Sequence, residues 1–101
     1  MGFTKADWSM IEGTSLVGYV TGTRREIEAV LGAPDEYGES DGDGKVTTEW
    51  LIRFDDGTVA TIYDWKRYED GAPGMDELYR WHIGGREGTA VRMVGDLLGG
   101  R

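Results

Sequence analysis

The sequence contains no cysteine, one histidine and two prolines. Without cysteine the chain can form neither a disulfide nor a thiolate metal site, and a cysteine nucleophile is excluded. His82 is its single imidazole, so a histidine cluster for a metal is impossible, and no serine lies in a nucleophile elbow. A phosphate loop and a dinucleotide fingerprint are also missing. These absences predict a protein that is not an enzyme and that uses no cofactor or metal.

Long hydrophobic runs and an excess of basic residues are missing as well. No stretch approaches the roughly 20 apolar residues that span a bilayer, and the N-terminal residues lack the apolar region of a signal peptide. Eleven Lys and Arg against 19 Asp and Glu give a net charge of −8, which repels a phosphate backbone. We therefore expect a cytoplasmic protein without a nucleic-acid or membrane partner.

The chain does contain enough large apolar side chains to form one core. Hydrophobic residues make up 39% of 101 residues, with four Trp and five Tyr. This length suits one folding unit. We predict an N-terminal arm over residues 1–12 and a single α+β domain over residues 13–99.

The local patterns predict the element order β-α-β-β-β-α, an antiparallel sheet with two helices. A short strand covers 15–20, and a capping box formed by Thr23 and Glu26 starts a helix whose apolar positions are Ile27, Val30 and Leu31. Two β-rich runs over 46–65 form a long hairpin, and 78–83 alternates as a third long strand. Gly84 and Gly85 are expected to end that strand and to precede a helix over 87–98.

The hairpin prediction includes a register. With Asp56 and Gly57 as a two-residue type I′ turn, Trp50 lies opposite Tyr63 on the core face, and Glu49 lies opposite Asp64 on the other. Like charges directly across a ribbon destabilise it unless a cation lies between them. The Glu49–Asp64 couple is therefore either a solvated or Arg-paired surface pair, or a site for magnesium or a ligand amine. Calcium binding by the Asp41–Gly44 stretch is rejected, because Lys45 stands where a third ligand is needed.

Aromatic and basic residues gather at the end of the hairpin and on the following strand. Rings can stack on a base, cations can hold phosphates, and a glycine-led helix start can receive an anion. A packed aromatic core is the alternative interpretation, and His82 beside Arg80 is either an anion ligand or a core residue. The candidate ligand-binding residues are Tyr63, Trp65, Lys66, Arg67, Arg80, His82, Gly84 and Gly85.

Three stretches resemble a loosely defined family of small bacteriophage-encoded proteins of uncharacterised function. They are Gly13–Val20, the run Glu49–Lys66, and Trp81–Gly85 with the helix after it. The resemblance covers about residues 13–98 and implies a phage origin and a location in the host cytoplasm. It transfers no functional residue.

Small acidic phage proteins without catalytic equipment act by binding, so the resemblance implies a counter-defence accessory protein. Our first hypothesis is sequestration of a small nucleotide-derived host immune signal, with the site at a subunit interface of a homo-oligomer. The alternative is a protein–protein inhibitor of a host defence enzyme, in which loop acids mimic nucleic-acid charge; these acids are the Asp35–Asp43 loop, Glu69, Asp70, Asp76 and Glu77. A virion structural or assembly protein is the third possibility.

Overall fold

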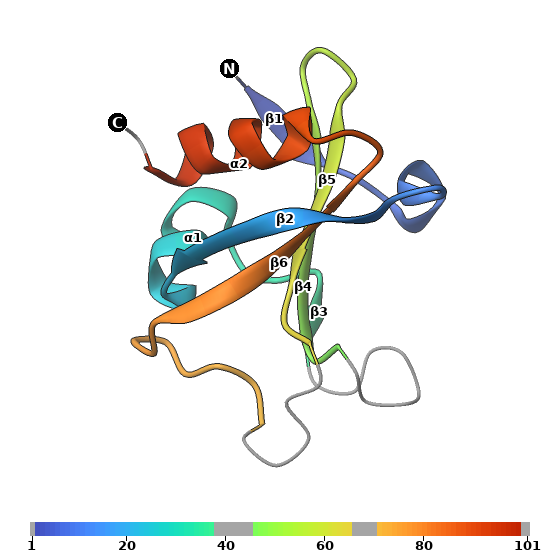
Figure 1. Ribbon diagram of the computed structural model, residues 1–101. Helices are drawn as coiled ribbons and strands as arrows, with labels where there is room; N and C mark the ends of the chain where they lie inside the picture. The colour runs from blue at the N-terminus through green and yellow to red at the C-terminus, as the bar shows by residue number, and fades with distance from the viewer. Residues whose placement is uncertain (1, 38–45, 66–70, 100–101) are drawn as a thin grey trace.

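The computed structural model describes residues 2–37, 46–65 and 71–99. Within these ranges the chain forms six strands, two α-helices and one short 3₁₀ helix, η1 (Figure 1). In chain order they are β1 (Phe3–Lys5), η1 (Trp8–Ile11), β2 (Ser15–Gly22), α1 (Arg24–Leu31), β3 (Glu36–Tyr37), β4 (Thr48–Phe54), β5 (Val59–Tyr63), β6 (Tyr79–Gly85) and α2 (Thr89–Gly99).

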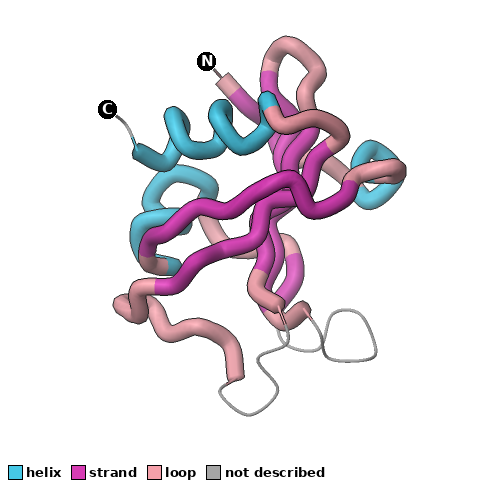
Figure 2. Tube along the Cα trace, in the orientation of Figure 1, coloured by secondary structure: helices cyan, strands magenta, loops and turns pink. Residues whose placement is uncertain are grey.

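The strands form one antiparallel sheet in the order β1-β4-β5-β6-β2, and β3 pairs with β4 beside β1. The sheet is strongly twisted, so that β2 and β6 cross obliquely in front of β4 and β5 (Figure 2). Both α-helices lie on one face, which we call the covered face, and η1 lies toward the other, the second face (Figure 1). The predicted α+β class is confirmed, with β1 and β3 as additional short strands.

The covered face holds the core of the protein. Two buried indoles, Trp50 and Trp81, meet edge to face with ring centroids 5.3 Å apart. Each donates its indole N–H to a backbone oxygen at one end of α1, Trp81 to Gly22 and Trp50 to Gly32. Burying a Trp without such a partner is costly, so these bonds fix α1 over the sheet. The core is completed by Ile27, Leu31, Ile52, Phe54, Ala60, Ile62, Ile83, Ala90 and Val94.

Helix α1 begins and ends as predicted. The Thr23 hydroxyl accepts from the Glu26 amide, and the Glu26 carboxylate accepts from the Thr23 amide at 2.9 Å, which completes the capping box. Gly32 ends the helix with a positive φ. Of the predicted apolar positions, Ile27 and Leu31 are buried, whereas Val30 is exposed. The helix therefore packs through a narrower stripe than its sequence indicates.

The hairpin between β4 and β5 exists, but its predicted register is wrong by one residue. The loop has three residues, Asp55–Gly57: Phe54 N–H donates to Thr58 O at 2.7 Å, and Gly57 N–H donates to Phe54 O at 2.9 Å. Gly57 has φ +92°, as the last position of a three-residue hairpin loop requires. Trp50 therefore lies opposite Ile62, and Tyr63 lies opposite Glu49.

This register reverses the faces of β5. Ala60 and Ile62 enter the core, whereas Thr61 and Tyr63 lie on the second face. It also separates Glu49 from Asp64, so the predicted like-charge pair is wrong. Asp64 is fully buried and accepts from the amides of Thr47 at 2.8 Å and Thr48 at 2.9 Å, and from the Thr47 hydroxyl.

The third long strand does not stop before Gly84 and Gly85, contrary to the prediction, but includes them as its last two residues. Both lie within β6, paired with Leu16 and Ser15 of β2. A Cβ on Gly84 would lie 2.4 Å from the Thr61 hydroxyl oxygen, and one on Gly85 would lie 2.8 Å from the Ala90 methyl carbon. These glycines allow close packing inside the sheet and under α2. They therefore form no anion-binding helix start.

Candidate functional site

Four ring side chains lie in contact on the second face, and we call them the aromatic row: Tyr19, Tyr63, Trp65 and His82. In the sheet register His82 of β6 lies between Tyr19 of β2 and Tyr63 of β5. Its ring centroid is 5.1 Å from that of Tyr19, edge to face, and 5.4 Å from that of Tyr63, stacked. Trp65 follows at 6.2 Å from Tyr63. The row thus crosses three neighbouring strands.

Two irregularities of the sheet place the row on this face. The three-residue hairpin loop moves Tyr63 out of the core, as described above. A β-bulge between Leu16 and Gly18 shifts the pairing of β2 with β6 by one residue. Because side chains alternate along a strand, the bulge puts Gly18 against α2 and Tyr19 on the second face.

Trp65 follows the end of β5, and hydrogen bonds hold this part of the chain in place. The buried Asp64 carboxylate ties this end of the hairpin to Thr47 and Thr48. The Trp65 amide donates to the Tyr79 hydroxyl at 3.2 Å. Trp65 and Tyr19 each keep 38% of their surface exposed. The ends of the row are therefore positioned by the fold, while part of the surface of each residue stays exposed to solvent.

Arg80 supplies a cation beside the row. Its guanidinium carbon lies 3.8 Å from the centroid of the Tyr19 ring, a cation–π contact. Arg80 is exposed and lies two residues before His82 on β6, so both side chains project from the second face, as predicted.

The surroundings of His82 favour the neutral form of its imidazole. Burial lowers the pKa of His82 below 6.5, the Arg80 charge lowers it further, and Asp64 acts in the opposite direction. The His82 Nδ1 atom is buried, and it has no hydrogen-bond partner among the residues that the structure describes. The pKa of Tyr63 is raised by burial first, then by Glu49 and Tyr19, so its phenol also stays neutral at physiological pH. The row presents neutral rings with one unsatisfied nitrogen.

A hollow of about 210 Å³ lies beside the row. Its lining includes Tyr63 and Trp65 of the row, Ile11 and Thr14 near η1, and Thr61 and Gly84 of the sheet. Usual ligand pockets have about 300 Å³ or more, so this hollow has room for a ring-sized group and not for a whole nucleotide. The rest of a larger ligand would extend over the row.

The structure brings together four of the eight predicted site residues: Tyr63, Trp65, Arg80 and His82. Gly84 lines the hollow, and Gly85 is buried under α2. Lys66 and Arg67 lie outside the described residues, as does the Asp41–Gly44 stretch. Tyr19 was missed by the sequence analysis. Gly18 inside the strand is a signal for the bulge that turns Tyr19 to the second face, but it does not tell which residues the bulge shifts. The prediction that Tyr63 belongs to the core face is wrong.

The acids proposed for nucleic-acid mimicry are partly used inside the protein. The Asp35 carboxylate accepts from Leu51 N–H at 2.8 Å and from Lys5 Nζ at 3.3 Å. Asp76 forms a two-bond ion pair with Arg25, at 2.7 and 3.0 Å. The Glu77 carboxylate accepts from an amide of its own loop, and Glu69, Asp70 and the 38–43 part of the first loop lie outside the described residues.

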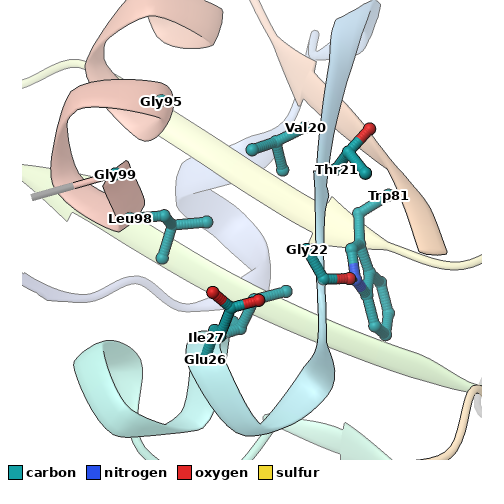
Figure 3. Close-up of a pocket in the computed structure, with 9 residues that line it drawn as sticks. All are labelled: Val20, Thr21, Gly22, Glu26, Ile27, Trp81, Gly95, Leu98 and Gly99. Atoms are coloured by element: carbon teal, nitrogen blue, oxygen red, sulfur yellow. The ribbon is translucent and has the colours of Figure 1, made fainter. Parts of the chain in front are cut away.

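Two other hollows differ in kind. One of about 150 Å³ lies between β2, α1 and α2 (Figure 3). Two of the polar groups at its wall are already used: Trp81 Nε1–H donates to Gly22 O, and Glu26 caps α1. A larger hollow of about 430 Å³ runs along α2 over Phe54, with exposed Arg92 and Asp96 at its rim. Exposed aromatic rings distinguish the row from both, because Trp81 and Phe54 at these hollows are buried.

Comparison with known proteins leaves the site to be interpreted from its own chemistry. The chain matches no protein-family model, no curated protein and no solved structure. In the described part of the chain, no three His, Cys, Asp or Glu residues are grouped to hold a metal ion. None of the helices there is long and apolar enough to cross a membrane.

The titration of His82 tests the electrostatics of the row. His82 is the only histidine, so NMR of its ring protons is unambiguous, and we expect a pKa below 6.5. The unfolded chain then binds more protons than the folded protein below pH 6.5, so stability falls as the pH falls from there through the folded-state pKa. His82→Gln should remove this part of the pH dependence. A pKa of 6.5 or higher would contradict the arrangement described.

Proposed function

We propose that the protein is a non-catalytic binding protein whose aromatic row stacks on the planar ring of a small nucleotide-derived ligand. The observation that carries this proposal is the row itself: four rings from the β2, β5 and β6 side of the sheet touch one another, and two are well exposed. Stacking on an aromatic side chain contributes about 1–3 kcal/mol per base. Rings gathered only for packing would be buried in the core, as Trp50 and Trp81 are.

The order of groups along β6 fits the parts of a nucleotide. Gly84 lines the hollow, His82 lies in the row, and Arg80 carries the cation. All three positions belong to the second face of β6, and Gly84 and Arg80 are about 13 Å apart along an extended strand. A base at the hollow would extend over His82 and bring its phosphate toward Arg80.

The His82 Nδ1 atom adds a second polar contact. A buried nitrogen without a partner destabilises the protein, and a ligand group that bonds to it would remove that penalty. An anionic ligand near Arg80 also favours the charged imidazole. Affinity should therefore rise as the pH falls below about 6.5, a lower window than the pH 8 to 6 range that the ordinary His pKa predicts.

The biological role that we propose is capture of a host immune signal by a phage counter-defence protein. It rests on the resemblance described above together with the absence of a catalytic motif in the sequence. Binding without chemistry suits a protein that acts by removing a signal from solution. The acidic inhibitor and the virion protein stay as alternative predictions.

A panel of nucleotides tests the proposed function. The protein is incubated with mononucleotides, cyclic mononucleotides, cyclic dinucleotides and NAD-derived signals, and complexes are detected by native mass spectrometry and thermal shift. We expect at least one member to bind and to be recovered intact after the protein is denatured. Recovery of a cleaved product would contradict the absence of chemistry, and no binding by any member would contradict the nucleotide class.

Salt separates the proposal from the charge-mimic alternative. A ligand stacked on rings keeps most of its affinity between low and physiological salt, because stacking does not depend on long-range charge. An acidic surface bound to a basic host enzyme loses affinity steeply over the same range. The two mechanisms also need different residues, the row in the first case and the loop acids in the second.

A further inference from the structure

The two edges of the sheet are built differently. On one side β4 is covered by two short strands, β1 with three residues and β3 with two. On the other side β2 is eight residues long, and in the described parts of the chain no strand pairs with its outer edge. None of its residues is buried. β2 is therefore a long strand with one open edge.

The sequence of this edge lacks the features that prevent strand pairing. Natural proteins protect sheet edges with charged residues, with proline or by keeping the edge strand short. Gly13–Thr23 contains neither a charged residue nor proline, in a chain with 30% charged residues, and it is the longest uncharged stretch. Its exposed side chains include Leu16, 47% exposed, and Tyr19, 38% exposed. Such an edge favours pairing with another strand.

We infer that β2 pairs antiparallel with β2 of a second copy of this chain, around a two-fold axis near the middle of the strand. Full overlap of two Ser15–Gly22 strands, with the bulge at Val17 and Gly18 opposite Val20 of the second copy, places the axis at Tyr19. A second copy fits this edge better than a charged partner, because an uncharged strand offers nothing to attract one. Pairing through this uncharged stretch also lets two molecules of net charge −8 meet without like charges directly opposite each other.

The pairing would join the two candidate sites. Side chains opposite each other in an antiparallel pair lie on the same face of the sheet. The second faces of the two copies would therefore be continuous, with Tyr19 of each copy beside the axis and the two aromatic rows end to end. The dimer does not depend on the proposed ligand, but a ligand that covers both Tyr19 rings would bind the dimer more tightly than a monomer.

The mass of the protein in solution tests the inference without any ligand. Light scattering and native mass spectrometry of the full chain should give twice 11.2 kDa at micromolar concentration. Leu16→Lys combined with Thr21→Lys places exposed cations along the edge and should weaken the dimer more than about 100-fold, because like charges in an interface repel each other. Val30→Lys, at an exposed apolar residue of α1, is the matched control and should stay dimeric. Thermal unfolding confirms that each variant is folded.

The salt dependence of dimerisation and a single introduced cysteine provide two further tests. Dimerisation should strengthen with salt, because screening weakens the repulsion between the two net charges. The chain has no cysteine, so Tyr19→Cys should form an intermolecular disulfide on oxidation, whereas Val30→Cys should not. A monomeric wild type, or a dimer that persists with both lysines in place, would overturn the inference. Either outcome leaves the nucleotide panel unaffected.

Discussion

Asp64→Ala should lower the free energy of unfolding by about 3 kcal/mol, a large part of the 5–15 kcal/mol typical of a domain. The Asp64 side chain is fully buried and accepts hydrogen bonds from two amides and one hydroxyl. Removing the carboxylate leaves the Thr47 and Thr48 amides without this acceptor in a closed environment. Urea denaturation with a linear extrapolation measures the loss.

Asp64→Asn is the matched control for this prediction. One amide oxygen can still accept from both backbone amides, and the NH₂ group can donate to the Thr47 hydroxyl, which then acts as acceptor. All three contacts are kept in neutral form, so we expect a cost of about 1 kcal/mol, the difference between charged and neutral hydrogen bonds. If Asn and Ala were equally destabilising, the role given to these contacts would be wrong.

The fold was predictable where local rules decide it. The capping box at Thr23 and Glu26 and the following Gly32 mark α1 by short-range hydrogen bonds and backbone conformation, and both ends are confirmed. The strand phase of β6 is likewise correct, with Trp81 and Ile83 buried.

The register between strands was not predictable in the same way. Gly57 can be the second residue of a two-residue loop or the third of a three-residue loop, and both use its positive φ. One residue of difference exchanges the faces of β5 and with them the position of Tyr63. The bulge in β2 likewise moves Tyr19 from one face of the sheet to the other. Half of the aromatic row therefore depends on pairings that no local pattern encodes.

The strand end predicted at Gly84 and Gly85 was wrong for a related reason. A Gly-Gly pair after an alternating run is typical of a strand end, yet β6 continues through Gly84, which pairs with both β5 and β2, to Gly85, which pairs with β2. They are needed because Thr61 and Ala90 occupy the space that a Cβ would take. That requirement comes from a neighbouring strand and from α2, so it becomes visible only when the sheet is assembled. Gly84 also lines the hollow beside the aromatic row.

Trp65→Ala should weaken binding of whichever nucleotide the panel identifies by roughly 10- to 100-fold, the loss expected from one base-stacking platform. Trp65 lies at the end of the row against Tyr63, lines the hollow and is 38% exposed, so its removal takes away a ring face without opening the core. Trp8→Ala is the control, because Trp8 is an equally large side chain, 50% exposed, on η1 outside the row. It should change affinity less than about twofold. Isothermal titration gives both affinities, and thermal unfolding of each variant separates lost stacking from lost stability. Equal effects of the two substitutions would show that the row does not hold the ligand, and partial recovery with Trp65→Phe would show that the ring face is what the ligand contacts.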